Sequence, residues 1–188
     1  MIIGIVGKKL SGKDTCADYL VKNYGFIKLS FAEPLKRMCK EGFDFSEEQV
    51  NGKLKETIDP DWGITPREIL QWLGTEIFRQ DIQKILPNIG ENFWIHLLDR
   101  KIKKILEQNP KQNIVIADVR FENEIKFIKN MNGHIIKIIR NNIEQTNYTQ
   151  HKSELLADNI EKPDHILLND GIIMENFYQR IRELMSLL

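Results

Sequence analysis

The chain has 188 residues, of which 41% are hydrophobic and 29% are charged, values typical of one globular domain and not of a disordered or fibrous chain. Its 27 Lys and Arg residues balance 27 Asp and Glu residues, which argues against a protein that coats nucleic acid through a large basic surface. With no apolar run near the ~18 residues of a membrane span and no signal-peptide pattern, we expect a soluble, cytoplasmic protein without a membrane partner.

The first part of the chain alternates between strand and helix patterns. The β-branched run Ile2 to Val6 is typical of a buried parallel strand. Apolar residues then recur at helical spacing from Lys13 to Tyr24, and Phe26 to Ser30 predicts a second strand. Pro34 is suited to the first turn of a further helix, which we expect to continue through Cys39.

The middle of the chain predicts helices and no strands. Residues 43–65 form the least regular segment of the sequence. Thr65 is a good N-cap for a helix that starts at Pro66 and runs to about Gln80, and a second long helix is expected from Glu91 to Gln108. We therefore expect residues of about 43–110 to form a helical lid that binds the substrate.

The last part returns to alternating strands and helices. Strands are predicted at Ile114 to Asp118, His134 to Ile139 and His165 to Leu168, with a helix through Phe127 and Ile128 and a closing helix to Leu188. The pattern predicts an α/β fold, a doubly wound parallel sheet of about five strands with helices on both faces. We expect a single domain over residues 1–188.

A phosphate-binding motif follows the first strand. The sequence GKKLSGK at residues 7–13 has the G-x-x-x-x-G-K spacing of a P-loop, between a strand and a helix. Its backbone N–H groups and the helix N-terminus attract phosphate oxygens, and Lys13 is expected to reach the β- and γ-phosphates of a nucleotide. The alternative is a surface turn rich in Gly and Lys. The glycine spacing disfavours a Rossmann dehydrogenase.

Two carboxylates are candidate Mg²⁺ ligands. Asp14 stands where most P-loops carry a Ser or Thr, and Thr15 supplies the hydroxyl one residue later. Asp14 could hold Mg²⁺ directly or through water, or act only as a favourable acid in the first helical turn. Asp118 ends a strand at the edge where such sheets bind ligands, so it could orient Mg²⁺ through water, bind the acceptor, or pair with Arg120.

Phosphoryl transfer also needs cations around both substrates, because the donor and acceptor phosphates repel each other. Arg79 and Arg140 are the weakest candidates by position. The full set of candidates is Lys9, Lys36, Arg67, Arg79, Arg120 and Arg140.

The motifs together resemble one enzyme family. GKKLSGKDT, FAEPLK, PREILQWLGTE, FW, DVRFENE, HKSE and NDG occur in the order found in the deoxynucleoside monophosphate kinases of viruses and phages. The resemblance implies a P-loop kinase that transfers the γ-phosphate of ATP to a deoxynucleoside monophosphate (dNMP), with Mg²⁺ as cofactor, to give a diphosphate for DNA synthesis. It implies catalytic roles for Lys13, Asp118 and Arg120, with Asp14 and Asp118 holding the metal through water.

The resemblance and the P-loop pattern together assign two substrate sites. ATP is expected to bind Gly7, Leu10, Ser11, Gly12, Lys13, Asp14, Thr15, Asn169, Asp170 and Gly171. The dNMP is expected to bind Lys9, Leu35, Lys36, Arg67, Gln71, Gly74, Trp94, Asp118, Arg120, Glu124 and His151.

Several of these residues have an alternative, structural interpretation. Trp94 could stack on a base or belong to the core, and Gln71 could read a base edge. Glu124 lies one helical turn beyond Arg120 and could serve only to orient it. His151 is as well suited to anchoring a loop as to binding a ligand.

Other functions stay open at this point. Phosphomevalonate kinases of the animal type share the SGKD loop and the D-x-R strand end, although the GTE and FW segments favour a nucleotide substrate. A P-loop ATPase or switch without an acceptor, and an inactive nucleotide-binding protein, are alternatives from other classes. We expect ATP and a dNMP as partners and no nucleic-acid polymer. The sequence decides neither the accepted base nor whether the chain forms a homodimer.

Overall fold

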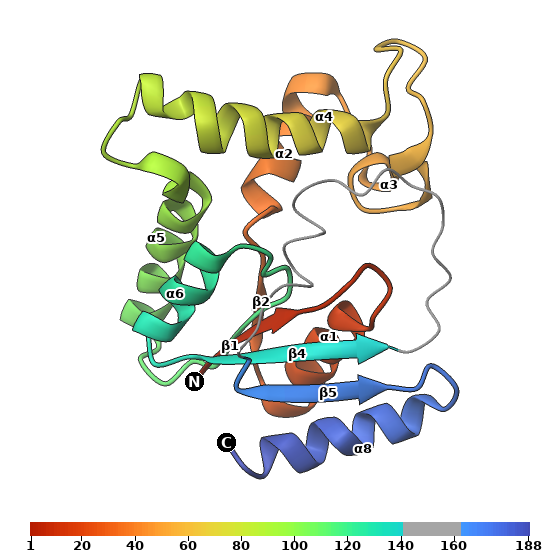
Figure 1. Ribbon diagram of the computed structural model, residues 1–188, viewed down its shortest axis with the longest axis vertical. Helices are drawn as coiled ribbons and strands as arrows, with labels where there is room; N and C mark the ends of the chain where they lie inside the picture. The colour runs from red at the N-terminus through yellow and green to blue at the C-terminus, as the bar shows by residue number, and fades with distance from the viewer. Residues whose placement is uncertain (141–162) are drawn as a thin grey trace. The chain divides into compact units, whose positions relative to one another are not determined.

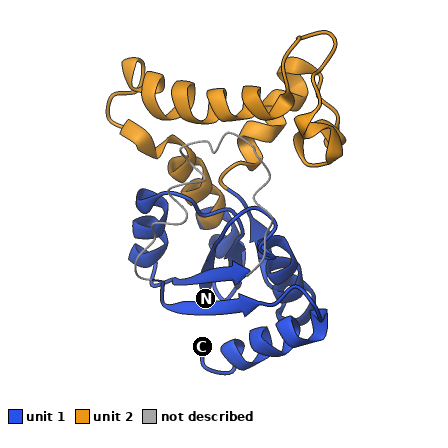
Figure 2. Ribbon diagram, turned by 45° about the vertical axis from the view of Figure 1, so that its right-hand side comes forward, with its two compact units in different colours: residues 1–30, 103–188 blue, residues 31–102 orange. Residues whose placement is uncertain are grey.

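The computed structural model describes residues 1–140 and 163–188. The chain divides into two compact units, one of residues 1–30 and 103–188 and one of residues 31–102 (Figure 2). We call them the sheet unit and the helical unit. The helical unit overlaps the lid expected over residues of about 43–110 but begins earlier. The expectation that all 188 residues form one kinase domain stays a prediction.

The sheet unit is built on five parallel strands in the order β2-β3-β1-β4-β5 (Figure 1). This confirms the predicted α/β fold with a parallel sheet of five strands. Because β1 is central, its carboxyl end lies between those of β3 and β4, where α/β sheets bind ligands. The strands are β1 (Ile2–Val6), β2 (Ile27–Leu29), β3 (Ile114–Ile116), β4 (His134–Arg140) and β5 (His165–Asn169).

Helices cover both faces of the sheet. Helices α1 (Lys13–Tyr24) and α8 (Met174–Met185) pack on one face, where Leu20 and Phe177 join a core cluster with side chains of β1, β3, β4 and β5. Helix α6 (Glu122–Asn130) packs on the other face, and a Cβ at Gly4 of β1 would lie 2.6 Å from Ile128 of that helix. Burial on both faces explains why β1 and β3 are continuous hydrophobic runs in the sequence.

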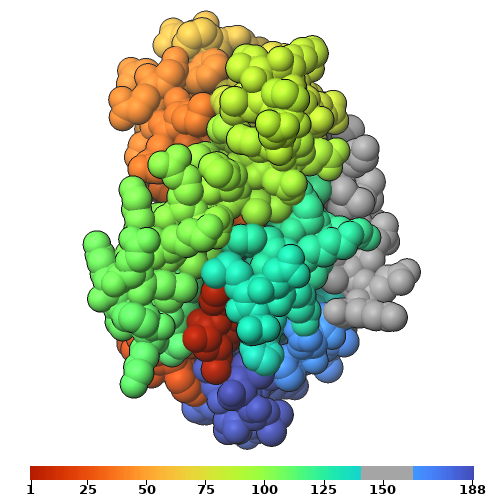
Figure 3. Space-filling model, turned by 90° about the vertical axis from the view of Figure 1, so that its left-hand side faces the viewer, coloured from red at the N-terminus to blue at the C-terminus, as the bar shows by residue number. Residues whose placement is uncertain are grey.

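The amino terminus lies at the surface of the sheet unit. The Met1 ammonium donates to Asn113 Oδ1 at 3.1 Å, and Figure 3 shows the first residues exposed beside α6. The P-loop follows the opposite end of β1. In the described part of the chain, no helix has both the length and the apolar character needed to cross a membrane.

The helical unit differs from the sequence prediction in two places. The helix that begins at Pro66 is α-helical only to Trp72 and continues as a π-helical segment over Leu73–Gln80. The segment expected to be irregular contains one short helix, α3, and a 3₁₀ turn. The elements are α2 (Glu33–Phe43), α3 (Glu47–Val50), the 3₁₀ turn Lys53–Glu56, α4 (Pro66–Trp72), the 3₁₀ turns Asp81–Lys84 and Gly90–Asn92, and α5 (Phe93–Gln108), whose residues from 103 on belong to the sheet unit.

An ion pair lies at the amino end of β5, at the end of the sheet opposite the P-loop. Lys129 of α6 pairs with Asp164, whose other carboxylate oxygen accepts from the Ile135 N–H at 2.6 Å. Burial raises the pKa of Asp164, but the Lys129 ammonium and the Ile135 N–H outweigh it, so the pKa lies below its ordinary value of 3.8. A lowered pKa contributes stability above the unfolded pKa, and that stability is lost as the pH falls through the folded value.

We therefore expect Asp164→Asn to lower the melting temperature at about pH 7 and to have a smaller effect at about pH 3, where a larger fraction of the wild-type carboxylate is protonated. Thermal unfolding of both proteins across this pH range is the measurement. The exposed pair Lys126–Glu122, with its atoms 3.7 Å apart, supplies the control Glu122→Gln, which should change the melting temperature little at either pH. A difference for Asp164→Asn that is independent of pH would contradict the role of its charge.

Candidate nucleotide-binding site

The P-loop joins β1 to α1 and depends on glycine at both ends. Gly12 is the N-cap of α1 with a φ of 105°, and a Cβ there would lie 2.6 Å from Asn169 Nδ2. A Cβ at Gly7 would lie 2.6 Å from the Ile138 carbonyl oxygen. Both glycines therefore permit close backbone approaches that any side chain would block. Leu10, at the exposed tip, adopts a left-handed φ of 63°.

Lys13 lies across this loop. Its Nζ donates to the carbonyl oxygens of Gly7 at 2.7 Å and Lys8 at 2.6 Å. The ammonium is therefore already held beside the loop, where a P-loop lysine meets the phosphates of a nucleotide. These contacts place the predicted catalytic lysine at the anion-binding end of α1.

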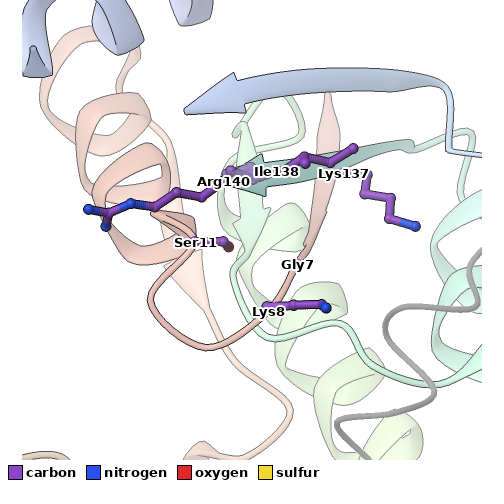
Figure 4. Close-up of a pocket in the computed structure, with 7 residues that line it drawn as sticks. Gly7, Lys8, Ser11, Lys137, Ile138 and Arg140 are labelled. Atoms are coloured by element: carbon purple, nitrogen blue, oxygen red, sulfur yellow. The ribbon is translucent and has the colours of Figure 1, made fainter. Parts of the chain in front are cut away.

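A buried hydroxyl in the loop is without a partner. Ser11 is 1% exposed, and its Oγ makes no hydrogen bond within the described residues. Such an atom is costly unless a ligand or water bonds to it. Ser11 also lines a cavity of about 360 Å³ between the P-loop and the end of β4 (Figure 4). The cavity is lined by Gly7, Lys8, Ser11, Lys137, Ile138, Ile139 and Arg140.

Asp14 is bound by a lysine that the sequence analysis did not include in the site. Lys28 of β2 donates to Asp14 at 2.8 Å and to Asp18 at 2.9 Å. Burial lowers the pKa of Lys28, but the two carboxylates outweigh it and raise the pKa above its ordinary value. This geometry fits an exposed acid in the first turn of α1, and a role for Asp14 as a metal ligand stays a prediction. Thr15 follows it, half-buried, in the same turn.

Asp118 lies just beyond β3, beside the strand that leads into the P-loop. The Val119 N–H donates to the Ile5 carbonyl at 3.3 Å, and the Asp118 carboxylate accepts from Ser30 Oγ at 2.6 Å. Sequence reasoning missed Ser30. Its position one residue after β2 is the signal that could have found it, because the ends of neighbouring parallel strands meet at one edge.

Glu124 acts on the backbone around Arg120. Its side chain is 1% exposed, and its carboxylate accepts from the N–H groups of Arg120 at 2.8 Å and Phe121 at 3.1 Å. Glu124 thereby fixes the start of α6 and the chain that carries Arg120, which matches its alternative role of orienting that residue. Its expected contact with the dNMP stays a prediction.

The NDG segment touches the P-loop directly. Asn169 Nδ2 donates to the Ser11 carbonyl at 2.9 Å, while its Oδ1 accepts from the Gly171 N–H at 3.0 Å. Asp170 accepts from the Ile172 N–H, and this bond, its largest influence, contributes to a lowered pKa of the carboxyl group. The two chain segments assigned to ATP, 158 residues apart at Ser11 and Asn169, are therefore neighbours in the sheet unit.

Three residues assigned to the dNMP site, Leu35, Gly74 and Trp94, lie in contact within the helical unit. Trp94 is 3% exposed, and its Nε1 donates to the Gly74 carbonyl at 2.9 Å. Its ring centroid lies 5.2 Å from that of Phe78 and 4.9 Å from that of Phe93. Leu35 packs so closely on Gly74 that a Cβ there would lie 2.9 Å from its Cδ2. The geometry favours the core interpretation of Trp94 over base stacking.

The cations assigned to the helical unit differ in their surroundings. Arg67, at the start of α4, donates from Nε to Glu56 Oε1 at 2.5 Å, and Gln71 lies one turn further along the helix. Arg79 is 6% exposed and donates to the Glu91 carbonyl at 3.4 Å, and its weak candidacy as a substrate-binding cation stays a prediction. His151 lies outside the described residues.

The predicted dNMP residues are thus divided between the two units. Lys9, Asp118, Arg120 and Glu124 belong to the sheet unit, and Leu35, Lys36, Arg67, Gln71, Gly74 and Trp94 belong to the helical unit.

Comparisons with known proteins agree on a nucleotide kinase. A family model described as deoxynucleotide monophosphate kinase matches residues 1–62 and 45–181. A protein of Acanthamoeba polyphaga mimivirus, named as a candidate deoxynucleotide monophosphate kinase, is 42% identical over 184 residues, covering 96% of this chain and 94% of its own.

Solved structures share the fold at low sequence identity. Dephospho-CoA kinase from Campylobacter jejuni has a TM-score of 0.51 at 16% identity, covering 98% of this chain and 95% of its own. TT1252 from Thermus thermophilus has a TM-score of 0.51 at 15% identity, and the match covers 100% of this chain and 97% of the TT1252 chain. These likenesses support the P-loop kinase fold.

Proposed function

This chain belongs to the deoxynucleotide monophosphate kinase family, and from that premise we propose that its P-loop binds ATP and passes the γ-phosphate to a dNMP. The observation that carries the proposal is the loop itself. Lys13 lies across it, the buried Ser11 hydroxyl is without a partner among the described residues, and Asn169 ties it to the NDG segment. A triphosphate bound in the loop would offer oxygen acceptors to the Lys13 ammonium and to the Ser11 hydroxyl.

The proposed chemistry is positioning and electrostatic stabilisation. Lys13 would exchange its bonds to the loop carbonyls for bonds to the β- and γ-phosphates, so that its charge acts where negative charge develops. Arg120, on the segment fixed by Glu124, would stabilise the group in transfer from the acceptor side. We propose no covalent intermediate and assign no general base.

The residues present fit a Mg²⁺ ion that arrives with ATP. No group of three or more His, Cys, Asp or Glu residues in the described ranges could hold a metal by itself. Mg²⁺ in kinases is held by one or two carboxylates, by waters and by the phosphates of the substrate, and the Asp118 carboxylate, just beyond β3 and beside the strand that leads into the P-loop, suits that role. Asp118 would hold the ion through water, and Asp14 is the second candidate. When bound, the ion neutralises phosphate charge and aligns the donor.

The acceptor phosphate is proposed to bind the cations that the sequence predicts for the dNMP site, which are Lys9, Lys36, Arg67 and Arg120. Gln71, one turn beyond Arg67 on α4, would contact the base. Leu35, Gly74 and Trp94 would support this surface from within the helical unit.

The proposal also has cellular and physical consequences. We expect a cytoplasmic enzyme, in the host cytoplasm if the chain is viral, whose partners are ATP and a dNMP and not a nucleic-acid polymer or a membrane. Size-exclusion chromatography with light scattering would decide between a monomer and a homodimer.

Turnover of a substrate panel tests the function. With ATP and Mg²⁺, at least one of dAMP, dCMP, dGMP and dTMP should give ADP and the matching diphosphate at a rate far above that of ATP alone. ADP release is measured by a coupled assay and the diphosphate by chromatography. Turnover of phosphomevalonate with no dNMP active, or ATP hydrolysis that no acceptor accelerates, would each replace the proposal with the corresponding alternative.

A further inference from the structure

Two neighbouring strand ends bond to the P-loop. Arg140 is the last residue of β4 and Asn169 the last of β5, and the two pair in register across the sheet. Arg140 Nη1 donates to the Leu10 carbonyl at 3.1 Å, and Asn169 Nδ2 donates to the Ser11 carbonyl at 2.9 Å. Paired side chains thus bond to two consecutive carbonyl groups of the loop, and Figure 4 shows Arg140 extending from β4 toward it.

Both side chains also contact the NDG segment. The Asn169 Oδ1 accepts from the Gly171 N–H at 3.0 Å. A Cβ at Gly171 would lie 2.6 Å from Arg140 Nε, so the guanidinium group lies directly against that glycine. Asn169 is 9% exposed and its amide is engaged at both ends. These surroundings suit residues that position the loop better than residues that merely border a base.

The bonds fix the orientation of two peptide groups. In a trans peptide the C=O and N–H point in opposite directions, and the described chain contains no cis peptide bond. When Arg140 holds the Leu10 carbonyl, the Ser11 N–H points the other way, where it donates to the Lys8 carbonyl at 3.2 Å within the loop. When Asn169 holds the Ser11 carbonyl, the Gly12 N–H likewise points away from it.

An anion site requires N–H groups on its inner side and carbonyl oxygens elsewhere, because carbonyl oxygens repel phosphate. We propose that Arg140 and Asn169 are positioning residues that hold the P-loop in its phosphate-binding orientation and couple it to the NDG segment. This inference rests on the proposed function in one respect, that the loop binds the phosphates of ATP. It assigns Asn169 a different action from the contact with ATP expected from the sequence.

Binding of ADP and of inorganic tripolyphosphate, both measured by calorimetry, tests the proposal. Tripolyphosphate has no base, so it reports on the P-loop alone. Asn169→Ala should weaken both ligands by a similar factor of about tenfold, and Arg140→Met by about fivefold. Loss of ADP affinity with unchanged tripolyphosphate affinity would overturn the proposal, because that result marks a residue that only borders the base. Ile172→Ala, at an 84% exposed neighbouring residue, is the control and should change neither.

A double variant separates positioning from simple charge. Arg140→Met also removes a positive charge, which would weaken a polyanion without any effect on the loop. If both residues hold the same segment, their effects overlap. The fold-loss of affinity in the double variant should then be smaller than the product of the two single fold-losses, by a factor of at least about three. A double loss equal to that product would overturn the proposal. If Asn169→Ala does not fold, Gly171→Ala replaces it in the cycle, because its Cβ would displace the Arg140 guanidinium.

These measurements do not depend on the phosphoryl acceptor. A chain that turns over no dNMP but shows the coupled losses would contradict the proposed function and support this inference. A chain that turns over a dNMP while its variants bind tripolyphosphate normally would contradict this inference alone.

Discussion

Lys13→Met is expected to lower kcat for dNMP phosphorylation by about a thousandfold, because it removes the charge proposed to act directly on the β- and γ-phosphates in the transition state. The lysine ammonium donates to two loop carbonyls, at 2.7 and 2.6 Å. These neutral carbonyl groups can bond to water once the lysine is replaced, so the fold should persist. Initial rates at saturating ATP and dNMP, with thermal unfolding of the same samples, provide the measurement.

Lys22→Met is the matched control, since Lys22 lies in the last turn of the same helix, away from the loop. It should retain wild-type kcat. A Lys13→Met enzyme with unchanged kcat and only a raised KM for ATP would mean that the lysine binds substrate and transition state equally, contrary to its proposed role.

Asp118→Asn is expected to lower kcat by about a hundredfold and to raise the Mg²⁺ concentration needed for half-maximal rate. The amide keeps the shape of the carboxylate and its oxygen can still accept from Ser30, whose Oγ lies 2.6 Å away, while the negative charge is lost. Rates measured over a Mg²⁺ titration separate a metal-linked role from a role in binding the acceptor.

Two further variants calibrate this result. Ser30→Ala keeps the charge of Asp118 and loses the hydrogen bond to it, so its rate should lie within about tenfold of wild type. Asp164→Asn makes the same chemical change at the opposite edge of the sheet, before β5, and should leave kcat unaltered. If Asp118→Asn behaved like Asp164→Asn, the placement of the active site at the end of β3 would be wrong.

Local sequence signals were sufficient for the sheet unit. Helix α1 runs from Lys13 to Tyr24 as predicted, because apolar spacing, the P-loop glycine before it and Gly25 after it all act within a few residues. The strands β1 and β3 are β-branched runs buried on both faces, so their hydrophobicity alone marks them. The P-loop was equally local, since its spacing and its place between strand and helix are both visible in the sequence.

Local signals failed where distant residues compete for the backbone. The pattern from Thr65 to Gln80 predicts one regular helix, but the Gly74 carbonyl accepts from the Trp94 indole and Leu35 packs against Gly74. This contact lies within the segment that changes from α to π geometry at Leu73. The same contact places Trp94 in the core. The residues next to Trp94 in the sequence do not indicate whether its ring is buried or stacks on a base.

The sequence by itself determined the chemistry available to this protein: a P-loop lysine, an acid at a strand end, and a chain order of motifs shared with one kinase family. Only the tertiary structure decided how those groups are held. Ser30 binds Asp118, Glu124 fixes the backbone at Arg120, and Arg140 and Asn169 hold the P-loop carbonyls. Most of these contacts form because the strand order brings the ends of particular strands and the P-loop together. The contact of Glu124 forms within the first turn of α6. Strand order depends on which long-range contacts bury the most apolar surface, and no short stretch of sequence specifies it.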